Sequence, residues 1–261
     1  AEAALTQSWR FGDAIAAAAS ALLQRLGETR AIQGNPSRQS SIIAAGVPNA
    51  ILARTNATVI KQTLAALDSG RKPHIVGGTK ELKRLVGDVF SLMRGEPGTH
   101  PDFFGFKNWE EVIAFAETDE GESLRPFVTL VLAHGAGALY AAITHHEPDA
   151  SSADIAISTA HKAKGSEWNA VELAADFSAN PNEDGAIGTE EFRLFYVAMT
   201  RARECLIADP AMLEGFIGAR RAATRPPLRA PRPVPVAPVP AALPSPTGHD
   251  SQSEDWPAGM F

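Results

Sequence analysis

The chain contains several stretches in which hydrophobic residues recur with the period of an α-helix. Between Asp13 and Leu26 they fall at i, i+3, i+4 and i+7, with Asp13 placed to cap the start and Gly27 to end the helix. The same pattern predicts a second strong helix, capped by Thr79 and ending near Met93. Further helices are predicted at about 59–67, at about 108–117 from a possible Asn108–Glu111 capping box, at about 124–145 with interruptions at Gly135 and Gly137, and at 189–203.

Short apolar runs lie between these helices and predict strands. They occupy residues 50–53, 74–76, 155–158, 171–174 and 205–208. Strands that alternate with helices are typical of βαβ units, so the predicted fold class is α/β with a parallel sheet. Polar stretches with Gly, Asn and Pro at 29–48, and with Gly, Pro and Phe at 95–107, predict loops.

The composition is that of a globular protein and excludes several other classes. Of 261 residues, 44% are hydrophobic and 21% are charged. No run reaches the roughly 18 uninterrupted apolar residues of a membrane span, and no secretion signal opens the chain, so no membrane partner is expected. The single cysteine, Cys205, excludes an intramolecular disulfide and fits a reducing cytoplasm. The net charge of -6 argues against a uniformly basic surface but permits a local nucleic-acid site.

The composition changes at Pro226. Ten of the 19 prolines lie between Pro226 and Pro257, which predicts an extended, disordered tail over residues 219–261. Five arginines between Arg220 and Arg232 suit acidic partners, although a solvated linker is the simpler interpretation.

The first segment with candidate chemistry is residues 5–11, which places an aromatic ring beside an arginine just before a predicted helix. The Trp9 ring can stack on a nucleobase, and Arg10 can hold a γ-phosphate through charge-assisted hydrogen bonds. The alternative is that Trp9 is a core aromatic and Arg10 a solvated charge.

The second segment is the predicted strand 50–53 with the residues that follow it. Arg54, Thr55 and Asn56 come at the carboxyl end of this strand, the edge at which open α/β sheets bind ligands. The alternative role for Asn56 is to cap the next helix.

The third segment, residues 157–168, runs from a strand into a loop of small residues. Gly165 permits a positive φ or a close backbone approach to a phosphate. Thr159, His161 and Lys164 can donate to DNA phosphates or stack under a base, and Glu167 can accept from a ribose hydroxyl. No cysteine or second histidine lies at ligand spacing, so no metal site is predicted, and a purely structural His161 is the alternative.

The fourth segment, residues 190–203, reads as a helix with arginines along it. Arg193, Tyr196, Thr200 and Arg201 fall at i, i+3, i+7 and i+8, so they are predicted to share one face. An arginine that projects from a packed helix supplies the fixed positive charge required of an arginine finger. The alternative is an amphipathic helix with solvated arginines.

Taken in this order, the four segments resemble motifs of the UvrD/Rep-type superfamily 1 DNA helicases, in their C-terminal (2A) motor domain. The third resembles motif V and the fourth motif VI, and the run 163–168 followed by 175–177 is nearest to the F-box DNA helicase branch. The chain departs from the family at several positions. Trp9 stands where Tyr is usual, Ser8 and Phe11 where Asn and Ser are usual, and Ser166 and Trp168 where Leu and Phe are common.

The resemblance implies a RecA-like parallel sheet flanked by helices, with a small helical insertion. The implied domains are a first part of domain 2A at 1–94, a reduced 2B-like insertion at 95–150, a second part of 2A at 151–218, and the tail at 219–261.

The resemblance also implies an ATP-dependent, 3′ to 5′ DNA helicase that uses ATP with Mg²⁺, serves DNA repair or recombination, and lies in the cytoplasm with the nucleoid. The implied catalytic residues are Arg10 and Arg201. The implied nucleotide site comprises Trp9, Arg10, Gly165, Glu167 and Arg201. The implied contacts to single-stranded DNA come from Arg54, Asn56, Thr159, His161 and Lys164.

One element of such a motor is missing from the sequence. No G-x-x-x-x-G-K-[ST] string occurs, and no acidic pair follows an apolar strand, so the P-loop and the Mg²⁺ ligands are expected on a separate N-terminal half. The chain begins at Ala1 and its first methionine is Met93, so we expect a fragment that is inactive as an ATPase alone. Two rival hypotheses are a non-catalytic DNA-binding or regulatory remnant and a protein-interaction module built on the proline-rich tail.

Overall fold

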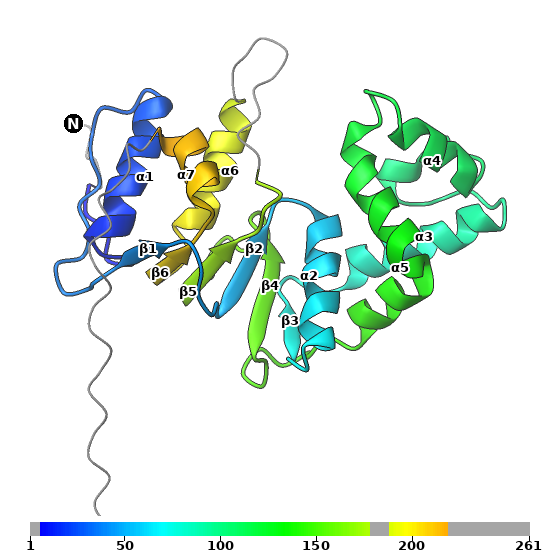
Figure 1. The fold of residues 1–261 in the computed structure, drawn as a ribbon, viewed down its shortest axis with the longest axis horizontal. Coiled ribbons are helices and arrows are strands. Elements are labelled where there is room, and N and C mark those ends of the chain that lie inside the picture. Colours follow the sequence, from blue (N-terminus) through cyan, green and yellow to red (C-terminus); the bar gives the residue numbers. More distant parts are fainter. Residues whose placement is uncertain (1–5, 178–187, 219–261) are drawn as a thin grey trace, which may run out of the picture. The chain divides into compact units, whose positions relative to one another are not determined.

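A six-stranded, all-parallel β-sheet forms the centre of the α/β fold (Figure 1). The computed structural model describes residues 6–177 and 188–218, so the predicted tail at 219–261 lies outside the described residues. The strands follow the order β1-β6-β5-β2-β4-β3 across the sheet. Their bounds are Ser41–Ile43 (β1), Ala50–Ala53 (β2), Pro73–Ile75 (β3), Ile155–Thr159 (β4), Trp168–Leu173 (β5) and Ala202–Ile207 (β6).

The central strand β2 shows why the sheet is covered on both faces. All four of its residues are buried, as expected of a parallel strand between two helical layers. Ala50 and Leu52 pack into a core with α1 (Asp13–Arg25), α6 (Thr189–Met199) and α7 (Pro210–Ile217). Ile51 and Ala53 pack into a second core with α2 (Asn56–Asp68). Successive side chains of a strand point to opposite faces, so the two cores lie on opposite sides of the sheet.

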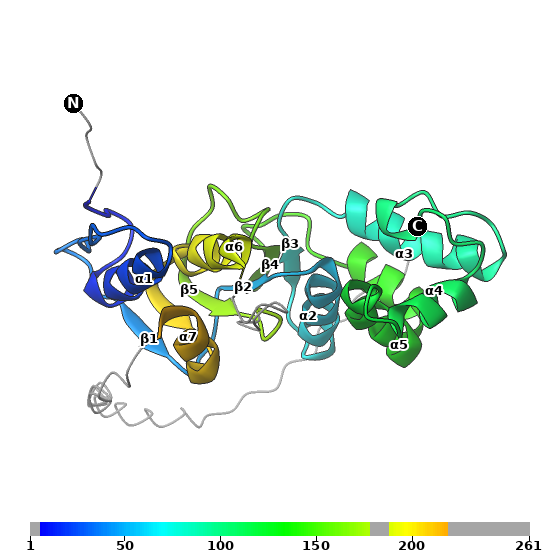
Figure 2. The same cartoon turned by 90° about the horizontal axis from the view of Figure 1, so that it is seen from above.

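A group of helices packs beyond α2. It comprises α3 (Lys80–Met93), α4 (Trp109–Ala116), α5 (Arg125–Thr144) and the short 3-10 turns η1 (Pro101–Phe103) and η2 (Glu122–Leu124). Helix α2 contacts both the sheet and α5 (Figure 2). The fully buried Phe103 anchors the group, with ring centroids 6.2 Å from Trp109 and 5.9 Å from Phe127. The predicted helical region within 95–150 is therefore present, whereas its boundary as a separate domain stays a prediction.

Helix α5 is the longest helix among the described residues and is rich in apolar side chains. The stretch Glu122–Thr144 is long and apolar enough to cross a membrane by length and composition, and it is the one such helix among the described residues. It packs against α2, α3 and α4, however, and Gly135 breaks it with φ 77° and ψ 144°. The predicted interruption at Gly135 is confirmed. Part of this apolar stretch is buried in the helical core, including Phe127, Leu139 and Ile143, while Leu132 and Tyr140 are exposed.

Several predicted boundaries were wrong. Helix α6 ends at Met199, so Thr200 and Arg201 do not continue its face, and β6 begins at Ala202. The predicted loop 29–48 contains the edge strand β1, and α7 was not predicted.

The predicted helix caps also need correction. Gly12 precedes α1 and Asp13 is its first helical residue, while Thr79 stands at the cap of α3 without a side-chain hydrogen bond. Thr55 caps α2 by accepting from the Thr58 N–H, so Asn56 does not cap it. The predicted cap at Asn108 is confirmed, because its side chain accepts from the Glu111 N–H at 2.9 Å.

Candidate functional site

The first group of candidate residues meets at the amino ends of β5 and β6. Glu167 directly precedes β5, and Arg201 directly precedes β6, whose first residues Trp168 and Ala202 are partners in the sheet. Arg10 reaches this edge from the segment before α1. Its Nε donates to the Glu167 Oε2 at 2.8 Å, across 157 residues of sequence. Segments one, three and four of the sequence are thus brought together.

Arg201 is held in the turn after α6 rather than on the helix. Its Nε donates to the Val197 carbonyl at 2.9 Å, and its Nη1 donates to the Ser166 carbonyl at 3.4 Å. Burial lowers the pKa of Arg201, and the positive charge of Arg10 lowers it further, while Glu167 opposes both effects. Arg201 stays charged at neutral pH because its ordinary pKa is far higher. The result is a fixed, partly desolvated cation at this edge.

Arg203 belongs to the same cluster, although the sequence argument did not select it. Its Nη1 lies 3.8 Å from the Glu167 Oε1, and its Nε is buried without a hydrogen-bond partner among the described residues. Arg10 and Arg203 therefore share one carboxylate, and Arg201 lies near enough for the charge of Glu167 to act on it without an ion pair between them. The described residues place no other acid within 4.0 Å of these three guanidinium groups. An excess of positive charge in one place is the electrostatic requirement for binding a polyanion.

Trp9 and Gly165 flank this arginine cluster in sequence. The Trp9 side chain is 72% exposed, so the core-aromatic alternative is wrong, and its backbone carbonyl accepts from the Asn35 Nδ2 at 3.0 Å. Gly165 has φ +90°, the left-handed conformation that its sequence context predicted, and no atom lies within 4 Å of where a Cβ would stand. An exposed ring and an open glycine backbone leave room for a ligand.

The remaining residues of the fourth segment divide between surface and core. Arg193 is solvated, with a side chain 68% exposed and a long pair to Glu190 at 3.7 Å. Tyr196 is half-buried, and burial raises the pKa of its phenol, while the nearby Arg201 and Arg10 oppose the rise. The solvated-arginine alternative therefore applies to Arg193, whereas Arg201 is held in the cluster.

The second group of candidates lies at the opposite, carboxyl edge of the sheet. Arg54 follows the last residue of β2, which is the sheet partner of Thr159 at the end of β4. The Arg54 Nε donates to both carboxylate oxygens of Glu191, at 2.9 and 2.8 Å, and its Nη2 donates to the same group. This pairing raises the pKa of Arg54. Arg54 is thus neutralised by an acid from the first turn of α6.

Asn56 and the loop after β4 share a third acid. The Asn56 Nδ2 donates to the Glu81 Oε1 at 2.9 Å, and the Lys162 Nζ lies 2.9 Å from the Glu81 Oε2. The hydrogen bond from Lys162 lowers the pKa of Glu81, and the one from Asn56 adds to this effect. Glu81 therefore ties the start of α2 to the loop after β4. Lys162 and Glu81 were not selected from the sequence.

The last three candidates differ in accessibility. His161 and Lys164 are exposed on the loop after β4, so both are available to a ligand. Thr159 is buried, and its Oγ1 accepts from the Lys162 N–H at 3.4 Å, so its side chain holds the loop. Arg54, Asn56 and Thr159 thus lie at the carboxyl ends of β2 and β4, whereas the loop that carries His161 and Lys164 leads from this edge to Ser166, whose carbonyl accepts from Arg201.

Two further observations bound the chemistry of the described residues. No group of three or more His, Cys, Asp or Glu among them could hold a metal ion.

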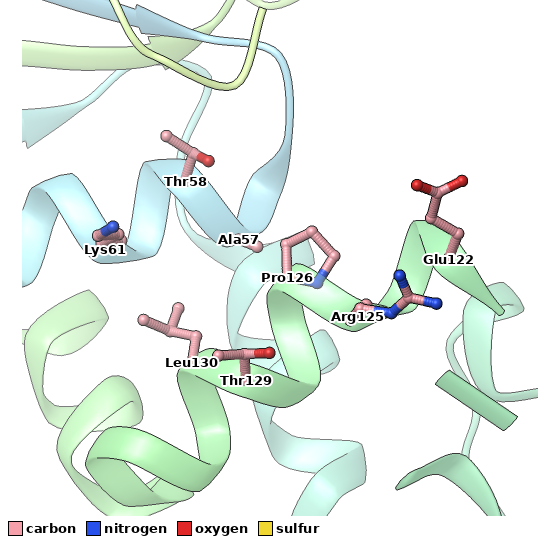
Figure 3. A pocket seen from close by; sticks show the side chains of 8 residues that line it. All are labelled: Ala57, Thr58, Lys61, Glu122, Arg125, Pro126, Thr129 and Leu130. Atoms are coloured by element: carbon pink, nitrogen blue, oxygen red, sulfur yellow. The ribbon is translucent and has the colours of Figure 1, made fainter. Parts of the chain in front are cut away.

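A cavity of about 360 Å³ lies between α2 and the start of α5 (Figure 3). The Arg125 Nε and Nη2 donate to the carbonyls of Ala116 and Thr118, so this side chain is already engaged. The cavity is lined by Ala57, Thr58, Lys61, Glu122, Arg125, Pro126, Thr129 and Leu130, none of which was predicted as a site residue.

Comparison with known proteins agrees with the motifs. Residues 107–209 match the UvrD-like helicase C-terminal domain. The F-box DNA helicase protein 1 of Schizosaccharomyces pombe is 28% identical, in an alignment that covers 78% of this chain and 27% of that protein. The F-box DNA helicase 1 of Gallus gallus is also 28% identical, over 80% of this chain and 24% of that protein. The chain spans about a quarter of the length of these relatives. The resemblance to UvrD-type DNA helicases is confirmed, and it lies in their C-terminal domain.

Proposed function

We propose that this chain is the C-terminal motor half of an ATP-dependent DNA helicase or translocase, which completes an ATP site and grips single-stranded DNA. The observation that carries the proposal is the arginine cluster at the amino edge, where Arg10 and Arg203 pair with Glu167 and Arg201 lies close enough to feel the charges of Arg10 and Glu167. Such a cluster suits the charge that develops on a transferred phosphoryl group. The relationship to DNA helicases supports the same role.

In this proposal the arginine cluster and the two residues that flank it, Trp9 and Gly165, bind different parts of ATP. Trp9 stacks on the base, and the open backbone at Gly165 admits the phosphates. Arg10 and Arg201 contact the γ-phosphate, with Arg201 as the arginine finger. Glu167 accepts from a ribose hydroxyl once Arg10 has turned to the phosphate. The Arg10–Glu167 pair therefore belongs to the nucleotide-free state, and ATP exchanges one partner of Arg10 for another.

The carboxyl edge forms the DNA grip in this proposal. His161 and Lys164 are exposed and meet the strand first. Arg54 and Asn56 lie at the end of β2 and the start of α2 and add contacts from the same edge. Thr159 contributes by fixing the loop that carries His161 and Lys164. Phosphate contacts of this kind bind DNA without reading its sequence.

The proposal assigns the P-loop and the Mg²⁺ ligands to a separate N-terminal domain. The sequence carries no P-loop, and the arginine cluster suits the phosphates of ATP but offers no set of carboxylates for a metal. Movement from 3′ to 5′, a function in DNA repair or recombination, and a nucleoid-associated location in the cytoplasm are parts of the same proposal.

The test is a reconstitution experiment. We expect the chain alone to bind fluorescent oligo(dT) and to show no ATPase, and a P-loop-bearing helicase half from the same organism to restore DNA-stimulated ATPase on mixing. The Arg201→Ala variant should abolish that gain. ATPase by the isolated wild-type chain, free of contaminating enzymes, would contradict the division of the site between two halves. DNA binding without restored ATPase would instead favour the non-catalytic remnant.

A further inference from the structure

Arg54 is the member of the DNA grip that is most strongly engaged within the protein. Its Nε and Nη2 form the edge of the guanidinium that receives paired oxygens, and both donate to Glu191. The two side chains are partly exposed, at 42% for Arg54 and 24% for Glu191, so a ligand can reach them from solvent. The phosphate-binding edge of Arg54 is therefore accessible but occupied.

A second carboxylate reinforces this arrangement. Asp176 accepts from the backbone N–H of Arg54 at 3.0 Å, from the N–H of Thr55 at 2.9 Å and from the Thr55 hydroxyl at 3.0 Å. Its negative charge, like that of Glu191, raises the pKa of Arg54. The Arg54 guanidinium thus pairs with one carboxylate and lies in the field of a second, so an approaching phosphate meets no excess positive charge from Arg54.

We propose that Glu191 is a latch that occupies the phosphate-binding edge of Arg54 until single-stranded DNA displaces it. The inference rests on the proposed function, in which Arg54 contacts DNA. A carboxylate and a phosphodiester offer similar paired oxygens, so the same guanidinium edge binds one of them at a time. Binding of the strand then requires that the Arg54–Glu191 pair opens, which lowers the apparent affinity.

The latch has a consequence for selectivity. When an isolated phosphate displaces Glu191, one contact of Arg54 replaces another, so the net gain in binding free energy is small. A strand that also reaches the exposed His161 and Lys164 gains contacts that the latch does not offset. A strand can keep these contacts while the Arg54–Glu191 pair is closed, whereas an isolated phosphate at Arg54 cannot bind until the pair opens, so the latch favours extended single strands over small phosphate compounds at this edge.

The experiment is a double-mutant cycle on the 261-residue chain, with affinity for fluorescent oligo(dT) measured by anisotropy at fixed salt. Glu191→Gln should tighten binding by about two- to fivefold, the range that an exposed ion pair supplies. Arg54→Gln should weaken binding. The double variant should bind like Arg54→Gln alone, because Glu191 acts only through Arg54. A contact that merely supported the fold would not produce a gain in affinity.

Glu190→Gln is the matched control, because Glu190 neighbours Glu191 but pairs only with Arg193 at 3.7 Å among the described residues. It removes the same charge from the same helix turn and should leave affinity close to that of the wild type. An equal gain from Glu190→Gln would show a general charge effect and overturn the latch. A loss of affinity in Glu191→Gln would also overturn it, by showing that Glu191 supports Arg54 for DNA.

The same data separate this inference from the proposed function. If Arg54→Gln weakens DNA binding while Glu191→Gln does not strengthen it, the latch fails and the DNA grip stands. If the wild-type chain does not bind oligo(dT), the DNA grip fails and the latch fails with it. Inorganic phosphate as a competitor tests selectivity, and it should displace DNA more readily from Glu191→Gln than from the wild type.

Discussion

The two edges of the sheet differ in how far acidic side chains compensate their cations. At the amino edge, Arg10 and Arg203 share the carboxylate of Glu167, and Arg201 beside them pairs with no acid among the described residues. At the carboxyl edge, each engaged cation has a carboxylate of its own, Arg54 with Glu191 and Lys162 with Glu81. One edge carries uncompensated positive charge and the other is neutralised from within.

The two edges are therefore suited to different anionic ligands. A cluster with more cations than carboxylates attracts a compact, highly charged anion, such as the phosphates of a nucleotide, although Arg10 has to exchange its partner Glu167. A neutralised edge binds an anion only in exchange for an internal partner, so its affinity comes from several such exchanges along an extended ligand. The difference in charge between the two edges therefore supports the proposed division into a nucleotide site and a strand-binding site.

The largest expected effect is on catalysis at the uncompensated edge. In a motor assembled with its P-loop half, Arg201→Ala should lower the ATPase rate by about 10³-fold or more, the contribution typical of an arginine finger. DNA binding should be retained. Arg193→Ala is the control, because Arg193 is a solvated arginine of the same segment, and it should leave the steady-state rate unchanged. Equal losses from both variants would remove the distinction between the cluster and an ordinary helix surface.

A smaller effect is expected at the neutralised edge. Arg54→Gln should weaken oligo(dT) binding several-fold, less than the roughly tenfold that a charged contact can supply, because the wild type must first open the pair with Glu191. The slope of log affinity against log salt should fall by about one. Titrations at several salt concentrations measure both quantities. An unchanged slope would show that Arg54 makes no phosphate contact.

Arg203→Ala sharpens the comparison further, because it removes one excess charge without touching the predicted finger. We expect the KM for ATP to rise by about two- to fivefold with little change in kcat, since Arg203 holds Glu167 at an exposed edge. Arg203→Lys keeps the charge, so its KM for ATP should lie between those of the wild type and Arg203→Ala. A fall in kcat with constant KM would instead place Arg203 at the reacting phosphate.

The smallest expected effect is on stability and comes from Glu81. Lys162 and Asn56 lower the pKa of this carboxyl below its ordinary value of 4.5, so the folded state favours the ionised form. The resulting stabilisation is present above pH 4.5 and is lost as the pH falls through the lowered pKa. Glu81→Gln should therefore be less stable than the wild type at pH 7, by under about 1 kcal/mol for a partly exposed pair. Urea unfolding at pH 7 and at pH 3 should show this gap closing in acid.

Much of the fold could be predicted because its elements are marked locally. The central strand β2 is a continuous apolar run, and its predicted bounds match the structure. Helix α7 also carried local signals that were overlooked, with Asp209 as its cap, Pro210 at its first position and Gly218 in the left-handed conformation at its end. Strand β1 offered little signal, because it is a three-residue edge strand within a polar stretch.

The end of α6 was missed for a different reason. No glycine or proline stands between Thr189 and Asp209, and apolar residues continue past Met199 into β6, so helical spacing extends beyond the real end. The helix ends in a turn in which the Arg201 N–H donates to the Ala198 carbonyl at 3.1 Å and the Arg201 side chain donates to the Val197 carbonyl. Pairing of Ala202 with Trp168 in the sheet outweighs the local preference.

The cationic and aromatic residues of the candidate site could be predicted, but most of their acidic partners could not. The cationic and aromatic residues were selected from recognisable strings, whereas the acids that pair with Arg54 and Lys162 were not. Glu191 lies 137 residues from Arg54, and Asp176 lies 122 residues from it. Glu81 belongs to a helix that carries no motif. Such pairings follow from the order of strands in the sheet, which spacing along the chain does not reveal.

Helix α6 links the two edges mechanically. Its 11 residues, a rod of about 16 Å, carry Glu191 in the first turn and lead directly to Thr200, whose carbonyl accepts from the Arg10 Nη1 at 3.1 Å. The bonds along a helix resist stretching, so a force applied at one end is delivered at the other. A displacement of Arg10 or Arg201 along this axis therefore strains the ion pair between Glu191 and Arg54.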